Sequence, residues 1–336
     1  MRLTLTVLLV GATLPFGAYA NGELNLYSSR HYDTDEALYS NFTEQTGITV
    51  NRIEDSADVL IERMRSEGEL SPADVLLTVD AGRMVRADDE GLLQPINSEK
   101  VNAAVPENLH AGNDHWVGVS TRARIIFYDP NEVSEPPQTY AELADPKYEG
   151  MVCTRSSSNV YMLGLLASMI AHDGEEAARA WAEGVKNNLA RDPQGGDTDQ
   201  LRAILSGECD IVLSNHYYYA RGKRKEVSGL TDGIEGISYV FPNQDSTGTH
   251  VNISGAGLAK HAPNADNARL FIEYLLTPEA QKMLGDGNDE YPVIEGVNAS
   301  PAVVEMGEFK RDDLALSDFA GKTADAQRIY NEVGYQ

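Results

Sequence analysis

Residues 23–54 read ELNLYSSRHYDTDEALYSNFTEQTGITVNRIE, and this stretch decides the fold class. Its first seven residues form a strand-like run, residues 34–46 repeat apolar side chains at helical spacing, and residues 48–54 form a second strand-like run. A periodic segment at 56–68 and the apolar run ADVLLTVD at 73–80 continue the pattern. The sequence therefore predicts a βαβαβ unit with a parallel sheet, in an α/β protein.

Two helix starts carry recognisable capping residues. Asp33 is followed three residues later by Glu36, which predicts a capping box at the start of the first helix. Thr277 is followed by Pro278, and this pair predicts a helix with threonine as the N-cap and proline at the first helical position.

A second α/β series follows the alternating segment RARIIFYDP at 122–130. GMVCTR at 150–155 is typical of a strand, residues 159–174 and 175–188 form two helical segments, and CDIVLSN at 209–215 is typical of another strand. The chain therefore contains two α/β units of similar size.

The 336 residues exceed the size of one usual hydrophobic core, so two lobes are expected. The strand-like segment HVNISGAGLAK at 250–260 lacks the third glycine of a dinucleotide-binding fingerprint, and we interpret its glycines as backbone crowding where the lobes cross. No low-complexity linker separates the two series. We predict an N-terminal lobe of residues 21–121 and 250–296, and a C-terminal lobe of residues 122–249 and 297–336.

The first twenty residues, MRLTLTVLLVGATLPFGAYA, have an early positive charge, an apolar stretch and a small-x-small ending. These features predict a signal peptide at 1–20 and export to the periplasm. No later run approaches the roughly 18 apolar residues that a membrane span needs. The formal net charge is −25, and such a balance argues against binding nucleic acid or anionic membranes, which needs clustered Lys and Arg.

Two cysteines occur, Cys153 and Cys209, and each lies eight residues before a tyrosine, Tyr161 and Tyr217. If the two strands involved are parallel neighbours, both tyrosines emerge at the same sheet edge. The same pairing would bring the cysteines within the Cα separation of roughly 5.5 Å that a disulfide requires. The sequence leaves open whether the disulfide forms.

Open α/β sheets bind ligands just beyond the carboxyl ends of their strands. Tyrosines occupy this position in three places, at Tyr32, at Tyr161 and in the run SNHYYYAR that contains Tyr217 and Tyr218. Three consecutive tyrosines cannot all face one way, so we expect Tyr219 to have a structural role. Whether the other four converge is the question that decides the function.

Converging phenols would suit ferric iron. A phenol with a pKa near 10 is only about 0.1% ionised at neutral pH, but a highly charged, oxygen-preferring cation can displace its proton. Zinc would predict clusters of His and Cys, and calcium or magnesium would predict closely spaced carboxylates. The sequence has neither pattern.

Signatures of common enzymes are absent from the sequence, which has no G-x-S-x-G, H-E-x-x-H, P-loop or C-x-x-C motif. An exported hydrolase with a nucleophile among Ser156–Ser158 is the enzymatic alternative. We interpret these serines instead as N-capping residues of the following helix, and no partner base is visible.

The chain resembles the periplasmic ferric-iron-binding proteins of ABC transporters, particularly the cyanobacterial type. The resemblance runs from the first strand nearly to the C-terminus. Its landmarks are NLYSSRHYDTD, DVLLTVDAGRM, STRARIIFYDP, RSSSNVY, SNHYYYAR, HVNISGAG, LTPEAQKML and EYPVIEGV. It implies a two-lobed periplasmic binding protein fold of the class II type, with crossing hinge strands and a metal site in the cleft.

The resemblance also implies a set of site residues. It implies that the metal ligands are Tyr32, Tyr161, Tyr217 and Tyr218. His31 is a ligand in some members of the family, whereas Asp80 lies in a DAGRM context that resembles the branch without an acidic ligand. Arg122 is the best match to an arginine beside the site, in an outer shell or holding an anion, and Arg155 and Arg221 are its rivals.

The function implied is a non-enzymatic, monomeric carrier that captures Fe(III), with water or a synergistic anion completing the coordination. It would deliver the iron to an ABC permease in the inner membrane. The alternative is a carrier of the same fold for a small organic or anionic ligand, held by Arg122, Arg155 and stacked tyrosines.

Overall fold

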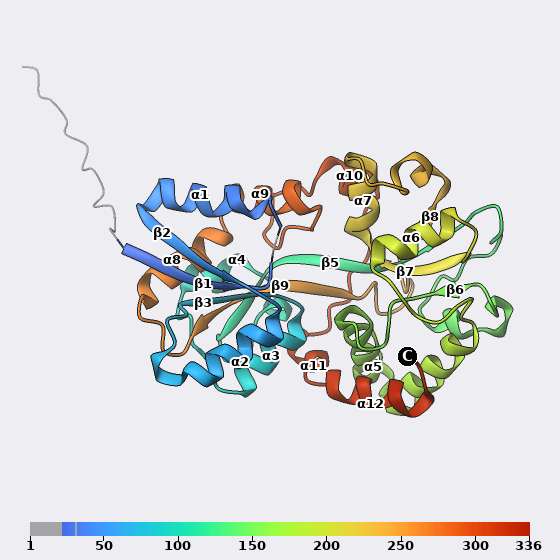
Figure 1. Ribbon diagram of the computed structural model, residues 1–336, viewed down its shortest axis with the longest axis horizontal. Coiled ribbons are helices and arrows are strands. Elements are labelled where there is room, and N and C mark those ends of the chain that lie inside the picture. The colour runs from blue at the N-terminus through green and yellow to red at the C-terminus, as the bar shows by residue number, and fades with distance from the viewer. Residues whose placement is uncertain (1–21, 31) are drawn as a thin grey trace, which may run out of the picture.

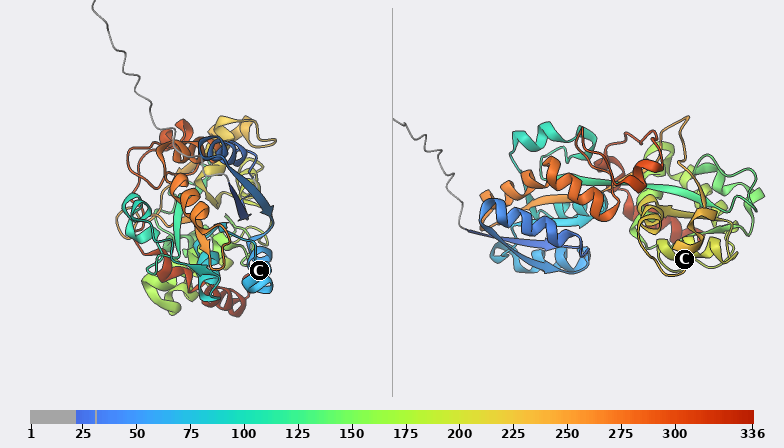
Figure 2. Two further views of the ribbon diagram at one scale, coloured as in Figure 1. Left: turned by 90° about the vertical axis from the view of Figure 1, so that its left-hand side faces the viewer. Right: turned by 90° about the horizontal axis from the view of Figure 1, so that it is seen from above.

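The computed structural model describes residues 22–30 and 32–336, so the predicted signal peptide and His31 lie outside the described residues. The chain forms two α/β lobes that lie side by side (Figures 1 and 2). The elements before the crossing are β1 (Gly22–Ser28), α1 (Asp35–Thr46), β2 (Ile48–Glu54), α2 (Ala57–Glu67), β3 (Val75–Val79), α3 (Ala81–Asp89), β4 (Leu93–Gln94) and α4 (Glu99–Ala104). The second series comprises β5 (Trp116–Tyr128), β6 (Val152–Cys153), α5 (Val160–Asn187), α6 (Asp197–Leu205), β7 (Ile211–Asn215), α7 (His216–Arg224) and β8 (Ser238–Val240). The remaining elements are β9 (Val251–Ala259), α8 (Ala265–Leu275), α9 (Pro278–Asn288), α10 (Pro301–Glu305), α11 (Leu316–Ala320) and α12 (Thr323–Val333).

The strand order β2-β1-β3-β9-β5-β7-β6 confirms the predicted α/β architecture. β1 pairs in parallel with both β2 and β3, as the βαβαβ reading requires. β9 runs antiparallel between β3 and β5, and it is crowded: a Cβ atom on Gly255 would lie 2.8 Å from Cγ of Met84. The glycines of this segment therefore allow close packing where the chain crosses, as predicted.

The lobes are joined by β5 and β9, which run through the waist of the molecule in Figure 1. β5 pairs with β9 over its first part and with β7 from Arg124 onward, so one strand belongs to both sheets. It begins six residues before the predicted segment at 122. A further crossing lies alongside, because Thr121 and Tyr291 exchange two backbone hydrogen bonds of 2.9 Å.

Apolar side chains pack on both sides of the sheets. One large cluster extends from the strands of the first lobe through α5 and α12, and a smaller cluster lies between β5, β7, α6 and α7. No helix among residues 22–30 and 32–336 is both long enough and apolar enough to cross a membrane.

The start of α1 differs from the prediction. The helix begins at Asp35 after Thr34, and no side chain caps it, so the predicted capping box of Asp33 and Glu36 is wrong. The side chains that could cap the helix have tertiary partners instead: the Glu36 carboxylate pairs with Arg52 at 2.7 Å, and the hydroxyl of the N-cap residue Thr34 donates to Asn288 Oδ1 at 2.8 Å. The predicted start of α9 is confirmed, since the Thr277 hydroxyl accepts from the backbone N–H of Ala280 ahead of Pro278.

α5 is two helices joined at Gly174, whose φ of 86° and ψ of 167° interrupt the helical backbone. This confirms the two predicted helical segments. The prediction that the serines at 156–158 cap the first segment is wrong. The N-cap is Asn159, whose side chain accepts from the backbone N–H of Tyr161 at 3.0 Å, while Ser156 and Ser158 contact each other.

Cys153 and Cys209 form a disulfide with a Cα–Cα distance of 5.9 Å. The strands that precede the two tyrosines are parallel neighbours, as the spacing argument assumed, although Cys153 is paired in register with Val212 and Cys209 lies just before β7. Both cysteines are buried beneath α6 and α7.

Removing the disulfide is expected to destabilise the protein, because it constrains the unfolded chain over a sequence separation of 56 residues. A Cys153→Ala, Cys209→Ala variant should lose about 2–4 kcal/mol of unfolding free energy. Urea denaturation measures this, with and without reductant. Reductant should lower the stability of the parent protein and leave the variant unchanged; equal stabilities in all four samples would contradict the expectation.

Candidate functional site

Four tyrosines from three separate segments lie just after a strand or at the start of a helix. Tyr32 follows β1, Tyr161 lies in the first turn of α5, and Tyr217 and Tyr218 lie in the first turn of α7. The hydroxyl oxygens of Tyr161 and Tyr217 are 3.2 Å apart, and the ring centroids of Tyr217 and Tyr218 are 4.4 Å apart. Tyr219 points elsewhere, with its ring centroid 5.4 Å from that of Phe127 in the core.

The four phenols are close enough to interact electrostatically. Burial raises the pKa of Tyr32, Tyr217 and Tyr218, and the neighbouring Tyr161 raises each of these pKa values further. The pKa of Tyr217 is also raised by Tyr218 and Tyr32. These three phenols are therefore protonated at neutral pH in the metal-free protein, and charge on one of them is felt by the others.

Three of the four tyrosines begin helices. Tyr161 lies in the first turn of α5, and Tyr217 and Tyr218 lie in the first turn of α7, the helix end that carries the positive part of the dipole.

Arg122 lies beside the tyrosines and is almost fully buried. Its Nη2 donates to Ser254 Oγ at 2.5 Å and lies 3.4 Å from a carboxylate oxygen of Glu290. Burial alone would lower the pKa of Arg122, but Glu290 and then the tyrosines Tyr161, Tyr217 and Tyr32 outweigh it and raise the pKa. Its Nε and Nη1 make no hydrogen bond to the described residues, so both are available to a bound anion.

Other arginines also lie against the tyrosine rings. The guanidinium carbon of Arg155 is 5.4 Å from the ring centroid of Tyr161, and that of Arg221 is 5.6 Å from the centroids of both Tyr217 and Tyr218. The sequence left these two residues as rivals of Arg122, and all three are at the site. The carboxylate partner of Arg155 is the buried Asp197, at 4.0 Å, so this arginine does not form a close ion pair at the surface.

A buried charge network beneath Tyr32 escaped the sequence analysis. Arg30 donates to Asp35 at 2.8 Å and to Glu290 at 3.0 Å, and its guanidinium carbon lies 5.0 Å from the Tyr32 ring centroid. Glu290 also accepts from Ser120 Oγ at 2.6 Å. The only signal in the sequence was that both charged residues lie within landmark segments, SSRHY and EYPVIEGV.

Loss of the Glu290 charge is expected to be costly. Burial alone would raise the pKa of Glu290, but Arg30 and Arg122 outweigh it and lower the pKa to about 2. A Glu290→Gln variant leaves both arginines without that counter-charge, which should cost about 3–5 kcal/mol of unfolding free energy at pH 7. Because the folded pKa is below the unfolded value near 4.5, the stabilisation is present above pH 4.5 and is lost as pH falls toward 2.

Chemical denaturation of this variant at pH 7 and pH 3 tests that expectation. The exposed Glu69→Gln is the matched control and should be neutral. A Glu290→Gln variant as stable as the control at pH 7 would show that the ion network contributes nothing net.

Asp80 has a structural role in this arrangement. It is the N-cap of α3, with a φ of 95°, and its carboxylate accepts from the backbone N–H of Gly82 and from Asn252 Nδ2, both at 2.8 Å. Within the described part of the chain, no group of three or more His, Cys, Asp or Glu side chains is arranged to hold a metal.

Together, two α/β lobes joined by crossing strands and a polar site at their junction define an extracellular solute-binding protein. A family of bacterial extracellular solute-binding proteins matches residues 71–312, and the chain belongs to this family. Iron uptake protein A1 from Synechocystis is 49% identical over 315 residues, covering 94% of this chain and 88% of the relative. Iron uptake protein A2 from the same organism is 47% identical over 332 residues, covering 98% and 94%.

Solved structures agree with this assignment. Trichodesmium IdiA (FutA), in complex with iron and citrate ligands, superimposes with a TM-score of 0.90 at 48% identity, covering 94% of this chain and 100% of that one. The two-lobed periplasmic binding protein fold predicted from sequence is confirmed.

Proposed function

We propose that this protein is a non-enzymatic carrier that binds Fe(III) between its lobes for iron uptake. The single observation that carries the proposal is the convergence of phenols from three segments, with the Tyr161 and Tyr217 oxygens 3.2 Å apart. A phenolate is a hard, anionic oxygen donor, and ferric iron is the biological cation that binds such a donor most strongly. The names of the relatives, iron uptake proteins and ferric iron-binding proteins, support the same cargo.

In this proposal Tyr32, Tyr161, Tyr217 and Tyr218 are the iron ligands. His31, which precedes the first of them, is kept as a further candidate ligand. Arg122 acts from outside the coordination sphere, where its Nε and Nη1 can hold an anion that fills the remaining coordination positions with or without water.

The charges at the site are suited to this role. Four phenolates and Fe(III) together carry one negative charge, and the arginines that face the rings can offset it. Arg155 and Arg221 lie against the rings of the proposed ligands, and Arg122 lies beside those rings. The net negative charge of the iron complex would therefore be compensated by nearby guanidinium groups.

Closure of the two lobes would bring the iron ligands of both lobes onto the same metal ion. We assign residues 21–121 and 250–296 to one lobe and residues 122–249 and 297–336 to the other, with bending at the crossing strands. Tyr32 belongs to the first lobe and the other ligands to the second, so iron binds both lobes only when they close, and this difference in affinity drives closure. The protein then acts as a monomer in the periplasm and passes its cargo to an ABC permease.

A carrier for a small organic or anionic ligand is the second candidate. The unpaired Nε and Nη1 of buried Arg122 favour it, because a buried guanidinium normally has its donors satisfied. The same donors serve an anion bound together with iron, so this observation alone does not exclude the first function.

One experiment separates the two functions. Ferric citrate is added to chelator-treated protein, and the visible spectrum is recorded. The iron function predicts a phenolate-to-iron charge-transfer band that saturates at one iron per chain. Calorimetry against a panel of organic anions without iron is the parallel measurement, and saturable binding there with no visible band would favour the second function.

A further inference from the structure

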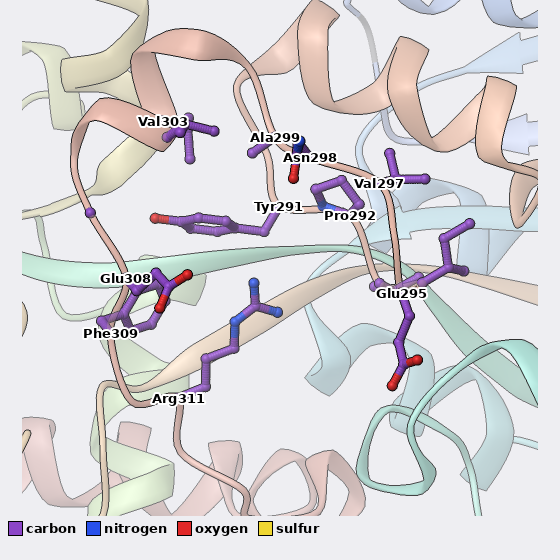
Figure 3. A pocket seen from close by; sticks show the side chains of 14 residues that line it. Tyr291, Pro292, Glu295, Val297, Asn298, Ala299, Val303, Glu308, Phe309 and Arg311 are labelled. Atoms are coloured by element: carbon purple, nitrogen blue, oxygen red, sulfur yellow. The ribbon is translucent and has the colours of Figure 1, made fainter.

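A second cavity lies at the hinge, outside the tyrosine site. It has a volume of about 490 Å³, is open to solvent and is lined by the segment 291–311, which runs from the crossing beside β5 through α10 (Figure 3). This volume is within the range of roughly 300–1,000 Å³ that is typical of small-molecule sites. None of the proposed iron ligands lines it.

The positively charged group that lines this cavity is the guanidinium of Arg311, which Figure 3 shows directed toward Tyr291. Among residues 22–30 and 32–336, its guanidinium makes one hydrogen bond, from Nη1 to Thr121 Oγ1 at 3.3 Å. No carboxylate of the described chain lies within 4.0 Å of it, whereas nearly every other described arginine has such a partner. In a protein with 52 acidic and 27 basic residues, an arginine without a carboxylate is unusual.

Two aromatic rings position the guanidinium of Arg311 in the cavity. Its guanidinium carbon lies 4.9 Å from the Tyr291 ring centroid and 5.7 Å from that of Phe309, so aromatic faces hold it in place. Burial against these walls lowers the pKa of Arg311, and the neighbouring Tyr291 opposes this effect. Arg311 is itself an exposed residue, so its remaining N–H donors can be reached from solvent, and a hydrogen bond between a guanidinium and a carboxylate is stronger than one between neutral groups.

The rest of the lining restricts what such a carboxylate carries. Pro292, Val303 and Phe309 provide apolar wall, which suits a compact hydrophobic body. Glu295 and Glu308 lie at the exposed edge, so a second negative charge on the ligand would be repelled there. The combination fits one carboxylate on an apolar group.

The cavity is separate from the tyrosine site but in contact with it. The Tyr291 ring stacks on His216, with ring centroids 4.3 Å apart, and His216 immediately precedes Tyr217. The His216 ring is fixed from its other side, because its Nδ1 accepts from the backbone N–H of Ala123 in β5. A ligand against Tyr291 therefore lies one ring away from the segment that carries two of the proposed iron ligands.

We propose that this hinge cavity is a binding site for a small monocarboxylate with an apolar body, anchored by Arg311 and packed against Tyr291 and Phe309. The test uses benzoate as the probe, titrated by calorimetry into the full-length mature protein, both free of metal and loaded with ferric iron. Benzyl alcohol and benzylamine are the comparison probes. Both keep the aromatic ring, but the alcohol is neutral and the amine is positively charged.

Saturable binding of one benzoate per chain is expected, with a dissociation constant of roughly 1 mM or tighter. Arg311→Gln should weaken it about tenfold or more, as expected for a lost charge-assisted pair. Lys310→Gln, which removes the adjacent positive charge that does not line the cavity, should bind benzoate like the parent protein. Benzyl alcohol should bind at least about tenfold more weakly than benzoate.

Three results would overturn the proposal. The first is the absence of saturation by roughly 10 mM benzoate. The second is benzoate binding that survives in Arg311→Gln and disappears in Arg122→Gln, which would place the anion in the tyrosine cleft. The third is tighter binding of benzylamine than of benzoate, which would make Glu295 and Glu308 the recognising groups.

Discussion

Replacing Tyr217 or Tyr218 by phenylalanine is expected to lower the affinity for ferric iron by more than about 100-fold, beyond the 10–100-fold typical for loss of an outer-shell partner. The same variants should lose much of the visible charge-transfer absorption, because each substitution removes one phenolate from the metal. The phenyl ring preserves the packing of the two rings, whose centroids are 4.4 Å apart, so the fold should be retained. Competition with a ferric chelator measures the affinity.

Tyr219→Phe is the matched control for this pair. Tyr219 lies in the same run of three tyrosines, but its ring packs against Phe127 and Tyr239, away from the site. It should leave iron affinity and the visible band unchanged. If Tyr219→Phe weakened iron binding as much as Tyr217→Phe, the assignment of ligands within the run would be wrong.

Iron affinity is expected to fall steeply on acidification. Burial raises the pKa values of Tyr32, Tyr217 and Tyr218 above 10, so all three phenols carry protons at neutral pH before iron binds. Each phenol that becomes a ligand releases its proton, and metal binding then competes with protons. With at least three protons displaced, the apparent affinity at fixed free Fe(III) should fall about 1,000-fold for each pH unit lowered.

The proton count can be measured directly. Iron is added to weakly buffered protein as a chelate of known protonation, and the acid released is titrated at pH 7. Three or more protons per iron are expected from the parent protein, and one fewer from Tyr217→Phe. Release of one proton or none would mean that carboxylates or water, and not phenols, hold the metal.

The sequence contained most of what positions the site. The alternation of strands and helices predicted the βαβαβ unit, and the parallel pairing assumed for the two cysteine-bearing strands placed Tyr161 and Tyr217 at the same sheet edge. The equal spacing itself is not kept in the register, because Cys153 pairs with Val212 and not with Cys209.

The charged surroundings of the site could not be predicted in the same way. Arg30 and Glu290 are 260 residues apart, and their ion pair exists only because the first loop and the last crossing meet beside β5. Tertiary contacts also explain the wrong capping box, since the Glu36 carboxylate pairs with Arg52 and the hydroxyl of Thr34 donates to Asn288. Local sequence rules assume that a polar side chain is free to cap its own helix, and here tertiary partners have taken it.

Anomalous diffraction at the iron absorption edge, from crystals of the protein loaded with ferric iron, tests the central claim most directly. The account predicts a single strong peak at bonding distance from the phenolate oxygens of Tyr32, Tyr161, Tyr217 and Tyr218. A peak coordinated by other side chains, with these four oxygens out of reach, would contradict it.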